Sequence, residues 1–167
     1  MRTLLILRHG KAQTGAPNGD KARVLVDRGE RESEAMGQLM RDLNLHIDAV
    51  VSSDAARARQ TAEIAAKAAG FSGDITLEPA IYGAGLDTLL SVVRKLPGNR
   101  ETVLLVGHNP GFEDLVSALG EEGSEPESLP TAGLAHLAFD RAATWRDVRE
   151  GTGRLVALHR PKDLREG

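Results

Sequence analysis

Two histidines and two arginines stand in short polar segments that directly follow apolar runs of the chain. Arg8 and His9 come after 3–7, Arg57 lies in the polar segment after a second run, and His108 follows another. An imidazole can attack phosphorus and hold the phosphoryl group covalently. Guanidinium groups match the charged oxygens of that group and stay charged at any working pH. These residue types therefore predict phosphoryl transfer through histidine.

Each of these residues also has a simpler interpretation. A lone histidine after a strand is more often a polar loop residue, and Arg57 on an alanine-rich helix is more often a solvated surface charge. The segment around Asn109 and Pro110 could be a tight turn. The chemical interpretation is favoured because suitable residues follow three separate strands, which is improbable by chance.

The elements that must position these residues follow an α/β pattern. Short apolar runs typical of buried strands alternate with segments in which apolar residues recur at helical spacing. We expect strands over 3–7, 48–52, 75–77, 102–106, 133–139 and 154–158. The alternation predicts a three-layer α/β/α sandwich around a mostly parallel sheet. In such sheets ligands bind beyond the carboxyl ends of the strands, where the polar segments lie.

Local signals predict where several elements begin and end. Asp27 and Glu30 have the spacing of a capping box, and Asp54 could cap the following helix. The acidic, proline-containing stretch 121–130 should be a loop, and the charged tail 161–167 should be loose.

Composition bounds the class of protein. The 167 residues suit one domain over 1–167, and a hydrophobic content of 41% is enough for a core. A net charge of −3 gives no attraction to nucleic acid or anionic membranes, and the lack of cysteine excludes thiol chemistry. No apolar stretch approaches the roughly 18 residues of a membrane helix, and no signal peptide is evident. We expect a soluble, cytoplasmic protein.

The polar segments together resemble the signatures of the histidine phosphatase superfamily, in its phosphoglycerate-mutase-like branch. Arg8-His9-Gly10 is similar to its R-H-G signature, and 107–110 is similar to its G-H-N-P. The segment 52–62 resembles S-S-P-L-x-R-A-x-Q-T-A, with Arg57 at the arginine. The resemblance spans nearly the whole chain.

The resemblance implies a phosphoglycerate-mutase-like fold with His9 as the nucleophile. It implies that Arg8, Arg57 and His108 form the phosphate pocket, and that no metal or other cofactor is required. The histidines show no metal-ligand spacing and no nearby cluster of carboxylates, which agrees with that expectation. The short chain and the segment 20–29 are most similar to the SixA-type phosphohistidine phosphatases.

The chain departs from the family pattern in two ways. Val24 and Asp54 replace prolines, which should affect loop rigidity more than chemistry. Mutase-like members of the family carry a glutamate that serves as general acid. This chain has Pro79 or Ile81 at the corresponding position, and the nearby Glu78 is out of register with it. By similarity to SixA-type proteins, Asp20 is the next candidate for the acid, and a solvated loop aspartate is the simpler interpretation.

Three functions are compatible with this pattern. The first is a phosphatase for phosphohistidine on a protein, and the second is a phosphomonoesterase or mutase for a small phosphorylated metabolite. The third is an inactive phosphate-binding domain, against which the intact Arg8, His9, Arg57 and His108 argue. The first is favoured because imidazole leaves readily, so the absence of the expected acid costs little.

Overall fold

A six-stranded sheet forms the centre of the protein, as the computed structural model describes it for residues 1–121 and 127–164. The sheet order is β3-β2-β4-β1-β5-β6. Strands β3, β2, β4 and β1 are parallel, whereas β5 runs antiparallel to both β1 and β6. The strands are β1 Arg2–Arg8, β2 Ala49–Ser52, β3 Ile75–Leu77, β4 Thr102–Gly107, β5 Leu134–Phe139 and β6 Arg154–His159.

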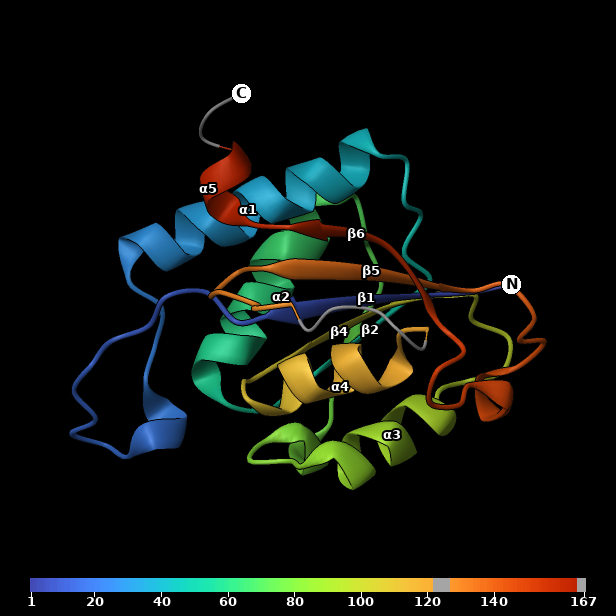
Figure 1. Ribbon diagram of the computed structural model, residues 1–167. Helices are drawn as coiled ribbons and strands as arrows, with labels where there is room; N and C mark the ends of the chain where they lie inside the picture. Colours follow the sequence, from blue (N-terminus) through green and yellow to red (C-terminus); the bar gives the residue numbers. More distant parts are fainter. Residues whose placement is uncertain (122–126, 165–167) are drawn as a thin grey trace.

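Helices cover both faces of the sheet, as Figure 1 shows, so the predicted three-layer sandwich is confirmed. One face carries α1, α2 and α5, and the other carries α3 and α4. The helices are α1 Asp27–Asp42, α2 Ala56–Ala68, α3 Leu86–Arg94, α4 Gly111–Leu119 and α5 Pro161–Leu164. Three short 3-10 helices lie in the described connections: η1 Asp20–Ala22 before α1, η2 Pro79–Ile81 before α3, and η3 Trp145–Asp147 between β5 and β6.

The apolar run of β1 serves two cores because successive side chains of a strand point to opposite faces. Leu4 and Ile6 pack in the core beneath α3 and α4, whereas Leu5 and Leu7 pack in the core beneath α1 and α2. All four are fully buried, and each buried leucine or isoleucine contributes about 1.5–3 kcal/mol. The strand that carries Arg8 and His9 is therefore held firmly from both sides.

The starts of two helices differ from the sequence-based expectation. Val26 is the N-cap of α1, and no side chain caps the helix, so the capping box predicted from Asp27 and Glu30 is wrong. Backbone packing sets this end instead, because a Cβ on Gly29 would lie 2.1 Å from the carbonyl oxygen of Lys11. Only glycine allows the helix to approach that loop so closely.

The predicted cap by Asp54 is also wrong. Ala55 is the N-cap of α2. The Asp54 carboxylate instead forms an ion pair with Lys21 at 2.8 Å. The backbone N–H of Ala55 donates to Ser53 Oγ at 3.2 Å, so Ser53 supplies the local hydrogen bond that Asp54 was expected to provide.

The C-terminal tail also differs from the sequence-based expectation. The tail is ordered as α5 over Pro161–Leu164, where we expected a loose segment, and its buried Pro161 and the partly buried Leu164 explain the order. Residues 122–126 of the expected loop and 165–167 of the tail lie outside the described residues. None of the helices that the structure describes is long and apolar enough to cross a membrane.

Candidate active site

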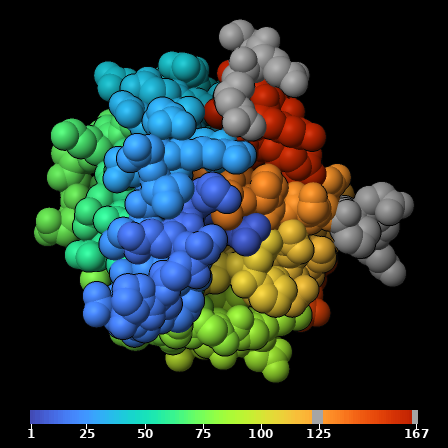
Figure 2. Space-filling view, turned by 90° about the vertical axis from the view of Figure 1, so that its left-hand side faces the viewer, coloured from blue at the N-terminus to red at the C-terminus, as the bar shows by residue number. Residues whose placement is uncertain are grey.

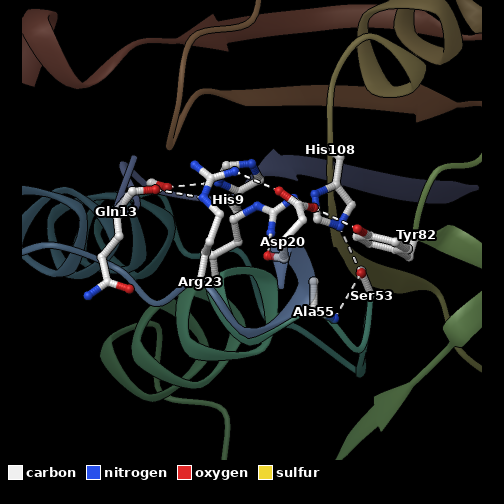
Figure 3. A network of polar contacts seen from close by, with 10 residues as sticks. His9, Gln13, Asp20, Arg23, Ser53, Ala55, Tyr82 and His108 are labelled. Carbon is white, nitrogen blue, oxygen red and sulfur yellow. Dashed lines mark hydrogen bonds and ion pairs between the residues drawn. The ribbon is translucent and has the colours of Figure 1, made fainter. Parts of the chain in front are cut away.

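Three strand ends meet at one edge of the sheet, and each supplies residues to the candidate site. Arg8 at the end of β1 is the register partner of Gly107 at the end of β4, and the His9 backbone N–H donates to the Gly107 carbonyl at 3.0 Å. The Ser53 N–H after β2 donates to Val106 at 3.0 Å. Figure 2 looks onto this edge, and Figure 3 shows the polar network there.

His9 is held in the form that a nucleophile needs. The residue is 8% exposed, and its Nδ1 lies 2.7 Å from the Gly10 carbonyl oxygen. A carbonyl can only accept, so Nδ1 carries the hydrogen and Nε2 keeps a free lone pair. Burial lowers the pKa of His9 to about 3, and the positive charges of nearby Arg57 and Arg8 act in the same direction. His9 is therefore uncharged at neutral pH.

His108 stands beside His9, with 5.2 Å between the ring centroids. Its Nε2 lies 2.8 Å from Ser53 Oγ, and Tyr82 packs edge-on against the ring at 5.5 Å. Burial and, to a smaller extent, the positive charge of Arg57 lower the pKa of His108 to about 4. The ring can donate a hydrogen bond to an oxygen held between the two histidines.

The two arginines are anchored by other parts of the chain. Arg57, 7% exposed in the first turn of α2, donates from NH1 to the Asp20 backbone carbonyl at 2.9 Å and from NH2 to Asp20 Oδ2 at 3.1 Å. Arg8 is partly buried and donates from NH1 to the Leu129 carbonyl at 3.0 Å. Both guanidinium groups are thus fixed before any ligand binds.

Unpartnered buried atoms concentrate at this site. Within the described residues, five buried side-chain nitrogen or oxygen atoms lack a hydrogen bond, and three of them are Arg8 Nε, Arg57 Nε and His108 Nδ1. Buried polar groups are almost always hydrogen-bonded, and leaving one unpaired costs about 1–3 kcal/mol. The three candidate phosphate-binding side chains therefore have hydrogen-bonding capacity to spare for an oxyanion.

Asp20 joins the site as an ionised carboxylate. Its oxygens accept from the Tyr82 hydroxyl at 2.6 Å, from Arg23 at 2.9 Å and from Arg57 at 3.1 Å. The hydrogen bond from Tyr82 and those from the arginines hold the pKa of Asp20 far below its usual range. A carboxylate in this state has no proton to donate, so the arrangement makes Asp20 an anchor for Arg57 and disfavours the acid role expected from the sequence.

The segment expected to carry the family's glutamate supplies no acid to the site. Ile81 is buried in the core beneath α3 and α4, and Pro79 begins η2. The Glu78 side chain accepts from the Ala80 N–H at 3.1 Å and lines a separate cleft between the sheet and α3.

Sequence reasoning missed three residues that the structure brings into this network. Ser53 and Thr61 stand within the 52–62 signature, so the motif contained the signal. Thr61 Oγ1 accepts from the Gly10 N–H at 2.9 Å and donates to the Arg57 carbonyl at 2.7 Å, joining two of the three segments. Tyr82 lies outside the recognised motifs, so nothing in the sequence indicated that it belongs to the site.

Gly10 links the end of β1 to α2 and α1. Its N–H is occupied by Thr61. A Cβ on Gly10 would lie 2.7 Å from the Gly29 carbonyl oxygen, so glycine is needed for contact with α1.

In the part of the chain that the structure describes, no group of three or more His, Cys, Asp or Glu side chains could hold a metal ion.

Comparison with known proteins identifies the family of the chain. The family model for histidine phosphatase superfamily (branch 1) matches residues 4–82. An uncharacterised protein of Mycobacterium tuberculosis is 32% identical over 164 residues, which cover 93% of this chain and 100% of that protein. The chain belongs to the histidine phosphatase superfamily, and its family and its fold support a phosphatase activity.

Within that superfamily the chain is similar to solved structures assigned as phosphohistidine phosphatase SixA. The protein from Agrobacterium tumefaciens is 32% identical with a TM-score of 0.78, and the match covers 96% of this chain and 99% of that one. The protein from Nakamurella multipartitia is 30% identical with a TM-score of 0.81, and the match covers 96% of both chains.

Proposed function

We propose that this protein is a metal-independent phosphatase that acts through a phospho-His9 intermediate on phosphohistidine carried by a protein. His9 Nε2 forms a bond to phosphorus while the bond from phosphorus to the substrate imidazole breaks. The electron pair leaves with that imidazole, whose other ring nitrogen already carries a proton, so the ring departs neutral and takes no proton from the enzyme. A water molecule then attacks phospho-His9, which releases inorganic phosphate and regenerates His9.

Arg8, Arg57 and His108 stabilise the negative charge that develops on the phosphoryl oxygens. Their unpartnered nitrogens supply donors that are already in place, so little reorganisation is needed during the reaction. The backbone carbonyls of Leu129 and Asp20 hold the two guanidinium groups, and Ser53 holds the His108 ring.

One observation supports phosphohistidine as the substrate. The site contains a neutral nucleophile, and neither Asp20 nor Glu78 is available as a proton donor. Asp20 is ionised and shared among three donors, and Glu78 is turned to its own backbone. Cleavage of an alkyl phosphate expels a poor leaving group, so an acid accelerates it about 10²–10⁴-fold. Imidazole has a conjugate-acid pKa of roughly 6.5 and leaves without such help.

The test is a comparison of kcat/KM for a phosphohistidine-bearing protein, phosphoglycerate and a sugar phosphate, combined with rapid quench of labelled substrate. We expect phosphohistidine to be preferred and an acid-labile, base-stable phosphoenzyme to accumulate. His9→Ala should lower turnover by about 10⁴-fold or more and abolish the label. His46→Ala, a change at an exposed histidine, is the matched control.

Three outcomes would contradict the proposal. Fast turnover without a trapped label, or an active His9→Ala variant, would remove His9 as nucleophile. A metabolite ester processed near 10⁵ M⁻¹s⁻¹, within the ordinary enzyme range of about 10⁴–10⁸, with phosphohistidine slower, would replace the protein substrate by a small phosphorylated metabolite.

A further inference from the structure

A second cleft lies next to the candidate active site, at the same edge of the sheet. It encloses about 300 Å³ and is lined by three segments: the start of α1, residues 128–131, and the junction of β6 with α5. Three cations border it, namely Arg28, Arg160 and Lys162, together with the hydroxyl-bearing Ser128 and Thr131 and the acidic Glu32. The proposed reaction uses none of these side chains.

Hydrogen bonds tie this cleft to the candidate phosphate site. Leu129, between two lining residues, accepts from Arg8 NH1 at 3.0 Å. The N–H of Ala132, next to the lining residue Thr131, donates to the carbonyls of Arg8 at 3.1 Å and His9 at 3.0 Å. In Figure 2 the light-blue α1, the orange segment from 127 and the red α5 border one another beside the dark-blue end of β1.

The cations around the cleft keep unused hydrogen-bonding capacity. Arg28 contacts Glu32 through Nε alone, at 3.4 Å. Arg160 contacts Glu127 and the Ser128 carbonyl, each at 3.2 Å, through NH2 alone. Lys162 is exposed and forms no ion pair with any described residue. The lining residues carry three positive charges against the one of Glu32, and Glu127 pairs with Arg160 from outside the lining. Positive charge is therefore in excess around the cleft, although the chain as a whole has a net charge of −3.

Guanidinium groups with free N–H donors bind carboxylates in a forked geometry, and an exposed lysine adds a point charge. A volume of about 300 Å³ is at the lower end for ligand sites and accommodates one or two side chains. The cleft thus fits carboxylate side chains that reach it while a phosphorylated residue lies at His9.

We propose that this cleft, bordered by Arg28, Arg160 and Lys162, is a specificity site that recognises Asp or Glu residues flanking the phosphorylated histidine of a protein substrate. This inference rests on the proposed function for the identity of the substrate. It adds that sequence context around the phosphohistidine, and not the phosphoryl group alone, determines which proteins are dephosphorylated.

The experiment measures binding of fluorescein-labelled peptides by fluorescence anisotropy, which does not depend on turnover. Two peptides carry phosphonodifluoromethyl-phenylalanine, a non-hydrolysable analogue of an aryl phosphate, flanked either by Asp or by Asn. Arg28→Gln with Lys162→Gln removes two exposed cations, and the control Arg141→Gln removes one exposed cation just beyond the far end of β5. An exposed ion pair changes affinity by roughly 1.5- to 5-fold. We therefore expect the double variant to bind the Asp peptide about 5- to 10-fold more weakly and the Asn peptide unchanged.

Several results would overturn the specificity site. They are equal or undetectable binding of the two peptides by the wild type, an equal loss for both in the double variant, or the same loss in Arg141→Gln. A parallel assay of phosphate release from phosphohistidine peptides separates this inference from the proposed function. A preference for the Asp peptide without phosphohistidine turnover would refute the proposed substrate and leave the cleft supported, whereas turnover without that preference would do the opposite.

Discussion

Acidification from pH 7.5 to pH 5.0 should leave the nucleophile uncharged. Burial lowers the pKa of His9 to about 3, so about 99% of the imidazole stays neutral at pH 5. A histidine with the ordinary pKa of about 6.5 would be only about 3% neutral there, a loss of roughly 30-fold in nucleophile. We therefore expect kcat/KM for p-nitrophenyl phosphate, corrected for substrate ionisation, to change less than about threefold over this range.

Two measurements check this expectation together. A pH–rate profile gives the apparent pKa of the free enzyme, and an NMR titration of the imidazole C–H resonances gives the pKa of the ring itself. His9→Gln identifies the His9 resonance, and His46→Gln serves as the control. A His9 resonance that titrates near 6.5, with a parallel fall in rate, would refute the argument from burial. A fall in rate with an unmoved resonance would assign the pH dependence to another group.

Other predictions follow from the same contacts. Arg57→Lys keeps the charge but loses the fork that donates twice to Asp20, so kcat/KM should fall by about 10²–10³-fold, and near-normal kinetics would exclude Arg57 from the phosphate pocket. The lowered pKa of His9 means that the unfolded chain takes up a proton below about 6.5 and the folded chain only near 3. Stability is therefore fully present above pH 6.5 and declines below it, by about 2 kcal/mol at pH 5 from His9 alone, and urea unfolding of wild type and His9→Gln should reveal this difference. Asp20→Asn should raise KM more than it lowers kcat for phosphohistidine, and a loss confined to kcat would restore Asp20 as the acid. EDTA should leave activity unchanged and vanadate should inhibit, whereas a loss in EDTA that a divalent cation restores would contradict independence from metals.

The fold could be predicted from the sequence because its strongest signals are local and periodic. Residues 4–7 are apolar on both faces of the strand, which is typical of a buried strand with helices on both sides. All six expected strands are found, within a few residues of their predicted bounds. The antiparallel direction of β5 was not predictable, because strand direction depends on connections across the sheet and not on side-chain periodicity.

Helix starts were predicted less well because tertiary packing overrides capping preference. Asp27 and Glu30 have the right spacing for a capping box, yet α1 begins where Gly29 packs on Lys11. Asp54 stands at a suitable position for a cap, yet its carboxylate pairs with Lys21 from a distant loop. Neither contact can be predicted from the local sequence, because each joins segments that come together only in the folded chain.

The candidate site shows the same division between local and distant information. The segments with Arg8, His9, Arg57 and His108 were recognisable because each lies directly after a strand, and the sheet brings strand ends together. The state of Asp20 was not recognisable, because it depends on Tyr82, which lies 62 residues away. A loop aspartate has the same appearance in sequence whether it is solvated, protonated or fixed in a network.

The network around Asp20 also bears on how the site releases its product. Arg57 already donates twice to Asp20, so a bound phosphate must share this guanidinium with a permanent carboxylate. The negative charge of Asp20 is fully present because Tyr82 and Arg23 hold it in the ionised form. A ground-state dianion such as inorganic phosphate is therefore held less tightly than the arginines alone would hold it. Since uniform tight binding of ground state and transition state does not raise kcat, a carboxylate that moderates phosphate affinity is compatible with turnover.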